Sequence, residues 1–216
     1  RTGSRLLQLR LKRGGASLED AELRHLQDEA QLIDAAGAAD IAHGIALSAD
    51  LKGEPPGPIG WRAKRHAGLI DVDRAGAYDP LDFWDPVHAG GRAEIILDPN
   101  EFYILASKEA VHVPPAFAAE MVPFDPLVGE FRVHYAGFFD PGFGHAAAGG
   151  QGSRAVLEVR SHEVPFLLTD GQKVGRLVYE RLTEAPDALY GSGSGGHYQA
   201  QGLQLSKHFK RVGGAN

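Results

Sequence analysis

Short alternating runs of apolar and polar residues dominate this chain. In residues 44–51, apolar side chains alternate with small or polar ones, as in a strand with one buried face. Similar runs recur as far as residue 182, separated by clusters of Gly and Pro. So many short strands in one chain predict a barrel or sandwich. The ten candidate strands are residues 44–51, 59–66, 68–72, 93–97, 101–107, 110–113, 131–137, 154–160, 165–168 and 174–182.

One segment has a helical pattern instead. Leu23, Leu26 and Ala30 recur at helical spacing, and Ser17 precedes them in the position of a capping residue. We predict that residues 14–40 form a helical linker, which ends in an Ala- and Gly-rich stretch. Residues 41–216 then form the main, strand-rich domain.

The first residues of the chain are similar to a later strand. Residues 3–9, GSRLLQL, match residues 171–177, GQKVGRL, in residue class at most positions. The match predicts that residues 1–13 are the last strand of a preceding copy of the same domain. Two ordinary strands of similar type are the alternative. The chain begins at Arg1, without Met and inside this alternating run, so we expect a further segment before it.

Composition narrows the classes of function. The chain has 216 residues, 43% of them hydrophobic, with 28 Gly and 13 Pro, which is typical of one turn-rich globular domain. There is no Cys, so a disulfide, a thiolate metal ligand and a cysteine nucleophile are all excluded. A net charge of −6 argues against a broad nucleic-acid-binding surface, and no apolar run is long enough to span a bilayer. We therefore expect a cytoplasmic protein without nucleic-acid or membrane partners.

The strand at residues 154–160 has a carboxylate in its middle. Leu157 and Val159 point to one face of this strand, whereas Glu158 shares the other face with Val156 and Arg160. A partly apolar environment favours the protonated form of a carboxyl group, which suits general acid/base catalysis. An ion pair between Glu158 and Arg160 on a solvated face is the alternative.

The sequence around this strand resembles a known family. Residues 135–144, YAGFFDPGFG, and residues 155–159, AVLEV, resemble the signature of dCTP deaminases, in which an Asp-Pro-Gly turn precedes a Leu-Glu strand. Residues 171–182 resemble the last core strand of that family, and residues 190–207 resemble its substrate-covering carboxy-terminal segment. The resemblance extends over residues 40–209.

The resemblance implies a mainly β, dUTPase-like (β-clip) fold: a distorted barrel or sandwich of short strands with a short N-terminal linker helix. It implies hydrolytic deamination of dCTP to dUTP and ammonia in a homotrimer or a pseudo-symmetric assembly of repeats. No metal held by protein ligands is implied, and Mg²⁺ would arrive with the triphosphate. Zinc deaminases hold their metal partly with Cys, which this chain lacks. By its position in the motif, Glu158 is the carboxylate that activates water and transfers protons.

The resemblance also implies roles for five other residues. Backbone groups of Ala136 and Phe138 would orient the base and the water. Asp140 would contact the sugar or anchor the turn. Tyr190 and Gln201 would contact phosphates; a loop tyrosine and an exposed amide are the alternatives.

This sequence departs from the family pattern in two places. Family members bind phosphates with an Arg-Ser-Ser-x-x-x-Arg segment, whereas residues 122–128 are VPFDPLV, without a guanidinium or a hydroxyl. Residues 120–135 resemble the carboxy-terminal half of the long, duplicated members, whose basic segment lies in the amino-terminal repeat. A competent site is therefore expected to need both repeats. The second departure is the Gly- and Ala-rich insert at residues 145–152, which forms either a hairpin extension or a lid.

Other functions remain open at this stage. A dUTP diphosphatase shares the fold but needs an Asp beside the α-phosphate, and no clear candidate is present. A non-catalytic repeat that serves trimer assembly or nucleotide sensing is compatible with the missing phosphate segment. Residues 191–196, GSGSGG, have the spacing of a dinucleotide-binding loop, but no helical pattern follows them. Arg62, Lys64 and His66 share a strand face, which is either a solvated charged face or an additional phosphate contact.

Overall fold

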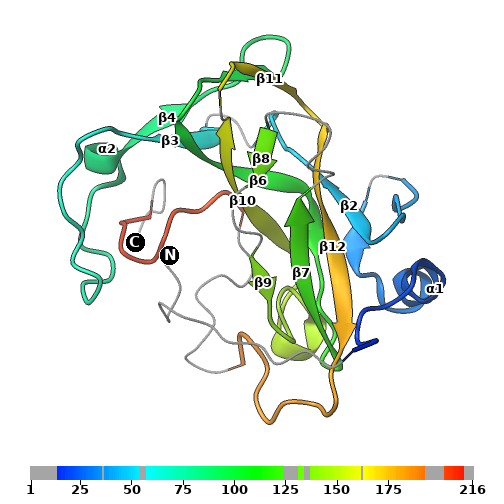
Figure 1. Ribbon diagram of the computed structural model, residues 1–216. Coiled ribbons are helices and arrows are strands. Elements are labelled where there is room, and N and C mark those ends of the chain that lie inside the picture. The colour runs from blue at the N-terminus through cyan, green and yellow to red at the C-terminus, as the bar shows by residue number, and fades with distance from the viewer. Residues whose placement is uncertain are drawn as a thin grey trace.

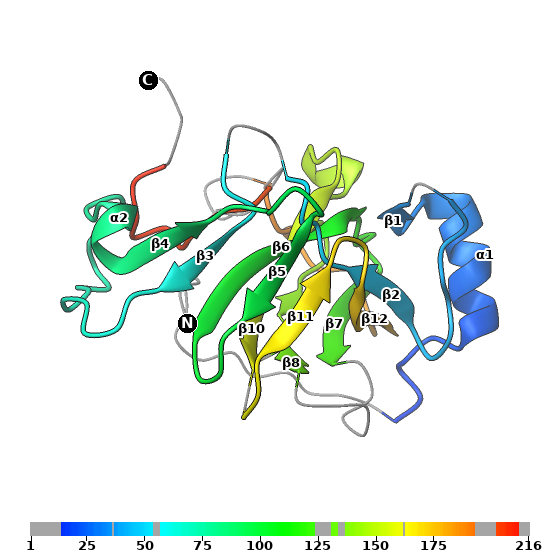
Figure 2. The same ribbon diagram turned by 90° about the horizontal axis from the view of Figure 1, so that it is seen from above.

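Three antiparallel sheets form the framework of the computed structural model. The model describes residues 14–35, 37–53, 57–123, 137–161, 163–192 and 202–211, and the backbone of residues 131–133. The sheets have six, four and two strands. The predicted mainly β fold, a distorted sandwich of short strands, is confirmed. Figures 1 and 2 show the two short helices at opposite ends of the molecule.

The six-stranded sheet has the order β4-β3-β6-β10-β8, and β1 also pairs with β6. Its longest strands, β6 and β10, pair over most of their length. The strands of this sheet are β1 (Ile33–Asp34), β3 (Gly60–Ala63), β4 (Trp84–Val87), β6 (Phe102–Val111), β8 (Phe131–Val133) and β10 (Ser153–Ser161).

The four-stranded sheet has the order β2-β12-β7-β9, and β5 pairs with β11 in a separate ribbon. β12 pairs with both β2 and β7, so it forms the centre of its sheet (Figure 1). These strands are β2 (Ile45–Ser48), β5 (Glu94–Leu97), β7 (Phe117–Pro123), β9 (Phe138–Phe139), β11 (Phe166–Thr169) and β12 (Lys173–Arg181).

The main hydrophobic core contains residues of all three sheets. Leu47 of β2, Leu105 of β6 and Leu157 of β10 belong to it, and none of the three is exposed. α1 (Asp20–Ala30) contributes Leu23, which is equally buried. The second helix, α2 (Pro80–Phe83), is a single turn between β3 and β4. Full burial of an aliphatic side chain stabilises the fold by about 1.5–3 kcal/mol relative to an exposed one.

Several predicted boundaries were wrong. The strands predicted at residues 101–107 and 110–113 are two parts of one strand, β6 (Phe102–Val111), which is bulged rather than interrupted. Residues 68–72 form no strand and are exposed, because no neighbouring strand pairs with them. Ser17 does not cap α1, since it forms a β-bridge with Glu180; the capping residue is Glu19. The predicted strand of a preceding repeat, residues 1–13, lies outside the described residues.

None of the helices in the described part of the chain is long and apolar enough to span a membrane.

Candidate active site

Glu158 lies in the middle of β10 and is half-buried. Its neighbours Leu157 and Val159 are fully buried in the main core, so strand alternation directs Glu158 to the opposite face. The register places Ile104 of β6 opposite Glu158, and Trp61 of β3 opposite Ile104. Facing residues of antiparallel strands share one face of the sheet. Glu158 therefore belongs to a cross-strand row in which the described residues Ile104, Trp61 and Pro86 are apolar.

A second hydrophobic cluster covers this face of the sheet. Trp61 and Ile104 pack there with Leu205 and Phe209 of the carboxy-terminal segment, residues 202–211. Figure 1 shows this segment, in red, passing between α2 and β10. The structure thus places the carboxy-terminal segment over the face that carries Glu158.

Loop 72–78 holds the carboxy-terminal segment in place through its backbone. The amide of Gly76 donates to the Lys207 carbonyl at 2.9 Å, and the amide of Lys210 donates to the Tyr78 carbonyl at 2.9 Å. His208 is buried, and its Nε2 lies 2.9 Å from the carbonyl oxygen of Val72. Val72, the last residue of the strand predicted at 68–72, therefore belongs to the loop that anchors this segment.

The Asp-Pro-Gly turn follows β9 and is fixed by backbone hydrogen bonds. The Asp140 carbonyl accepts a hydrogen bond from the amide of Phe143 at 3.0 Å. The Gly142 amide donates to the Val113 carbonyl, and the Val113 amide donates to the Phe143 carbonyl, both at 2.9 Å. Gly142 has φ 95°, and a Cβ there would come within 2.8 Å of the Leu189 Cβ. Glycine is therefore required in this turn by conformation and by space.

Tyr190 is brought against the same turn. Its amide donates to the carbonyl of Pro141 at 2.8 Å, and its ring centre lies 5.9 Å from that of Phe143. Phe143 in turn packs on Phe139 of β9, with ring centres 5.1 Å apart. Tyr190 is partly buried against the main core. These contacts give Tyr190 a packing role, and its phosphate contact stays a prediction.

The predicted site residues occupy two parts of the structure. Phe138 lies in β9, where it faces Glu120 of β7, and Asp140 opens the turn that follows. The far end of this turn meets the start of β10, since the amide of Gly152 donates to the carbonyl of Gly144 at 2.8 Å. Glu158 lies further along the strand, roughly 3.4 Å per residue from that point. Ala136 and Gln201 lie outside the described residues.

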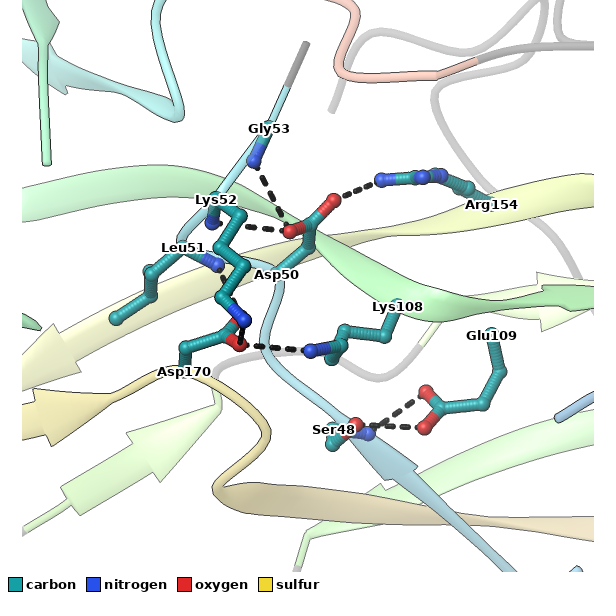
Figure 3. Close-up of polar contacts among 9 residues, drawn as sticks. All are labelled: Ser48, Asp50, Leu51, Lys52, Gly53, Lys108, Glu109, Arg154 and Asp170. Atoms are coloured by element: carbon teal, nitrogen blue, oxygen red, sulfur yellow. Dashed lines mark hydrogen bonds and ion pairs between the residues drawn. The ribbon is translucent and has the colours of Figure 1, made fainter. Parts of the chain in front are cut away.

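A polar network links β2 to β6 and β10, and sequence reasoning missed it. Figure 3 shows the Asp50 carboxylate between the Arg154 guanidinium and the amides of Lys52 and Gly53. Asp50 is only 7% exposed. Arg154 precedes Glu158 on the same strand, so this ion pair ties β10 to the end of β2. The only signal in the sequence is an acidic residue that directly follows a run of buried strand positions.

A bulge in β6 supplies the other half of this network. Between Arg154 and Val156, β10 has one residue, whereas the facing part of β6 contains Ser107, Lys108 and Glu109. The Ser107 hydroxyl accepts the amide of Ala155 at 2.9 Å and donates to the carbonyl of Glu109 at 2.7 Å. The bulge therefore replaces ladder hydrogen bonds with side-chain ones.

The two charged residues of the bulge reach neighbouring strands (Figure 3). Lys108 Nζ donates to Asp170 Oδ2 at 2.7 Å, and Asp170 Oδ1 accepts the amide of Leu51 at 3.1 Å. The Glu109 carboxylate accepts both the amide and the hydroxyl of Ser48, at 2.8 and 2.6 Å. Burial alone would raise the pKa of Asp50 and of Asp170, but these hydrogen bonds and the neighbouring cations outweigh burial and lower both pKa values.

The insert at residues 145–152 forms one wall of an open cavity of about 420 Å³. His145 caps a short 3₁₀ helix (Ala146–Ala148), since its Nδ1 accepts the amide of Ala147 at 3.1 Å. Across the cavity, His112 Nε2 lies 3.1 Å from Asp34 Oδ1. Burial and the nearby His112 lower the pKa of His145.

In the described ranges, no three His, Asp or Glu side chains are grouped so that they could hold a metal ion.

The lowered pKa values of His145, Asp50 and Asp170 predict that acid destabilises the fold in two steps. A lowered folded-state pKa means that the stabilisation is present above the unfolded-state pKa and is lost as pH falls through the folded-state pKa. His145 therefore begins to reduce the free energy of unfolding below about pH 6.5, and Asp50 and Asp170 do so below about pH 3.8. Urea unfolding at intervals from pH 7.5 to pH 3 measures both steps. H145N keeps a capping acceptor and is expected to remove only the first step; a first step that persists in H145N would contradict the assignment.

The three sheets and the covered carboxylate face define a protein of the dUTPase-like β fold. The chain matches the family model described as 2′-deoxycytidine 5′-triphosphate deaminase, C-terminal domain, over residues 19–209. It belongs to this dCTP deaminase family.

Individual relatives agree with this assignment. The crystal structure of 2′-deoxycytidine 5′-triphosphate deaminase from Agrobacterium tumefaciens is 60% identical, with a TM-score of 0.72, and the match covers 81% of this chain and 50% of that one. A protein named "dCTP deaminase, dUMP-forming" from Beutenbergia cavernae is 29% identical over 155 residues, covering 68% of this chain and 76% of its own. A protein of the same name from Halobacterium salinarum is 35% identical over 119 residues, covering 53% and 56%. This chain thus spans half the length of the Agrobacterium protein.

Proposed function

We propose that this chain deaminates dCTP hydrolytically, giving dUTP and ammonia, with Glu158 as the general acid/base. The observation that carries the proposal is the position of Glu158. It occupies the motif position of the family's carboxylate and lies half-buried in mid-strand, on a face that the carboxy-terminal segment covers. Such a site combines limited access to water with a group that can transfer protons.

The proposed reaction needs one carboxylate and one water molecule. Glu158 takes a proton from the water as its oxygen attacks C4 of the cytosine, and passes this proton to N3. A second proton from the attacking hydroxyl then moves through Glu158 to the amino group. The C4–N bond breaks, ammonia leaves, and the C4 carbonyl of uracil remains. Backbone groups of Ala136 and Phe138 would hold the base and the water, while Asp140 would anchor the turn or contact the sugar, and no protein-bound metal takes part.

The names of the relatives favour a second candidate, in which the product is dUMP. That reaction needs an additional hydrolysis that removes diphosphate. Incubation of the chain with dCTP, followed by nucleotide chromatography and an ammonia assay, distinguishes the two. We expect dUTP and ammonia in equal amounts. Accumulation of dUMP and diphosphate would support the second candidate, and the absence of ammonia would contradict deamination by this chain.

Assembly and location belong to the same proposal. We infer a homotrimer or a pseudo-symmetric assembly of repeats in the cytoplasm, with Mg²⁺ carried by the nucleotide and phosphate contacts from Tyr190 and Gln201. A non-catalytic repeat that serves assembly or nucleotide sensing is the alternative, because residues 122–128 lack the family's basic segment. Such a repeat would bind dCTP without releasing ammonia.

A further inference from the structure

The carboxy-terminal segment, residues 202–211, is drawn to the sheet by apolar packing. Its side chains Leu205 and Phe209 belong to the cluster on the face that carries Glu158. Phe209 also packs edge-on against Trp84, with ring centres 6.1 Å apart. The hydrophobic effect has no direction, so this packing attracts the segment without fixing where along the face it lies.

A buried histidine supplies a directional contact. His208 is only 3% exposed, and its Nε2 lies 2.9 Å from the carbonyl oxygen of Val72, in loop 72–78. A carbonyl oxygen can only accept, so Nε2 carries a proton and donates. In the neutral ring, Nδ1 then accepts from the Ser206 hydroxyl, whose oxygen lies 3.2 Å away. Both ring nitrogens are therefore used, and the ring is held in one orientation.

Three further hydrogen bonds between this loop and the segment join backbone groups. The amide of Gly76 donates to the Lys207 carbonyl at 2.9 Å. Tyr78 pairs twice, since its amide donates to the His208 carbonyl at 3.1 Å and its carbonyl accepts the Lys210 amide at 2.9 Å. These backbone bonds do not require a particular side chain.

The bond to Val72, by contrast, needs a donor at the position of the His208 Nε2. Residues 68–76 are exposed, so the loop gains little from burial of its own. The positions of the loop and of the segment therefore depend on the bonds between them. A net hydrogen bond shifts an equilibrium roughly 2- to 10-fold, which is enough to change how much of the protein has the segment in place.

We propose that His208 is a positioning residue: its bond to Val72 keeps the carboxy-terminal segment on the face that carries Glu158, and thereby sets the affinity for the nucleotide. This inference rests on the proposed function. In molecules whose segment is released, Leu205 and Phe209 no longer cover the face, and a nucleotide has to order the segment as it binds. The apparent affinity then falls with the fraction of molecules that are competent to bind.

Two measurements on variants at position 208 test the proposal. Hydrogen exchange of the Lys210 amide, compared with exchange of the β10 amides, reports release of the segment. Isothermal titration in the E158Q background, where turnover does not enter, gives the dissociation constant for dCTP. H208L fills the site without a donor, whereas H208Q offers an amide nitrogen near the position of Nε2.

We expect H208L to speed exchange of the Lys210 amide about fivefold, without a matching change in β10, and to weaken dCTP binding by a similar factor. H208Q is expected to keep both values within twofold of the reference, because it restores the donor. The matched control is H25L, the same substitution at an exposed histidine of α1, at the opposite end of the molecule from α2 (Figure 1). It is expected to change neither value.

Four results would overturn the proposal: unchanged exchange in H208L, unchanged dCTP affinity in H208L, equal losses in H208L and H208Q, or no binding of dCTP by the reference protein. The test is separate from that of the proposed function. Ammonia release by the unmodified chain decides the reaction, whereas the exchange and binding series decide the role of His208. A chain that releases no ammonia but loses dCTP affinity in H208L would keep the positioning role and lose the reaction.

Discussion

Glu158→Gln is expected to reduce ammonia release from dCTP by about 10²–10⁴-fold, the usual contribution of general acid/base catalysis. Glutamine has nearly the same shape as glutamate but cannot accept a proton from water at neutral pH. The half-buried position in β10 therefore stays filled, and the fold is expected to remain intact. The measurement is the steady-state rate of ammonia release, together with the dissociation constant for dCTP. A loss in rate without a loss in affinity identifies a chemical role.

The control for this variant is E184Q, which neutralises an exposed carboxylate in the loop after β12. Its rate is expected to equal that of the unmodified chain. Turnover by E158Q within threefold of the unmodified chain would show that Glu158 is not the catalytic group, even though the fold assignment would stand. Unfolding midpoints of both variants exclude loss of structure as the cause.

Gly144→Ala is expected to have the largest effect on stability. Gly144 has φ 64°, and a Cβ there would lie 2.0 Å from the carbonyl oxygen of Val111 and 2.8 Å from the amide nitrogen of Ser153. Both contacts are with backbone, which cannot rotate away. The left-handed conformation and the overlap together are expected to lower the free energy of unfolding by about 3 kcal/mol or more. Urea unfolding measures this loss.

Gly149, in the insert that directly follows Gly144, separates the two causes. Gly149 has φ 76°, but a Cβ there would meet no atom within 4 Å. Gly149→Ala therefore carries only the conformational cost, about 1–2 kcal/mol. If both variants lost the same stability, the close approach of Gly144 to Val111 and Ser153 would not matter. The consequence for the site is direct, since this approach joins the Asp-Pro-Gly turn to the start of β10.

The strands with one buried face were predictable because their side chains alternate. β10 shows the pattern most clearly, with buried Ala155, Leu157 and Val159 and half-buried residues between them. β7 was missed because most of its positions are buried, so no alternation marks it. The apolar residues Leu69, Ile70 and Val72 caused the opposite error, a predicted strand where none forms. The pattern resembles a strand, yet residues 68–76 form an exposed loop, and Val72 and Gly76 within it hold the carboxy-terminal segment through hydrogen bonds.

The sequence alone determined the mainly β class, the Asp-Pro-Gly turn, and the side of β10 on which Glu158 lies, because turn chemistry and strand alternation act between near neighbours in the chain. Only the tertiary structure decided what faces that carboxylate. Ile104 and Trp61 reach its row through sheet register, and Leu205 and Phe209 cover the same face from the far end of the chain. The Asp50–Arg154 pair likewise joins residues that are distant in sequence. Register and the packing of distant segments depend on the whole set of strands at once, so no local pattern contains them.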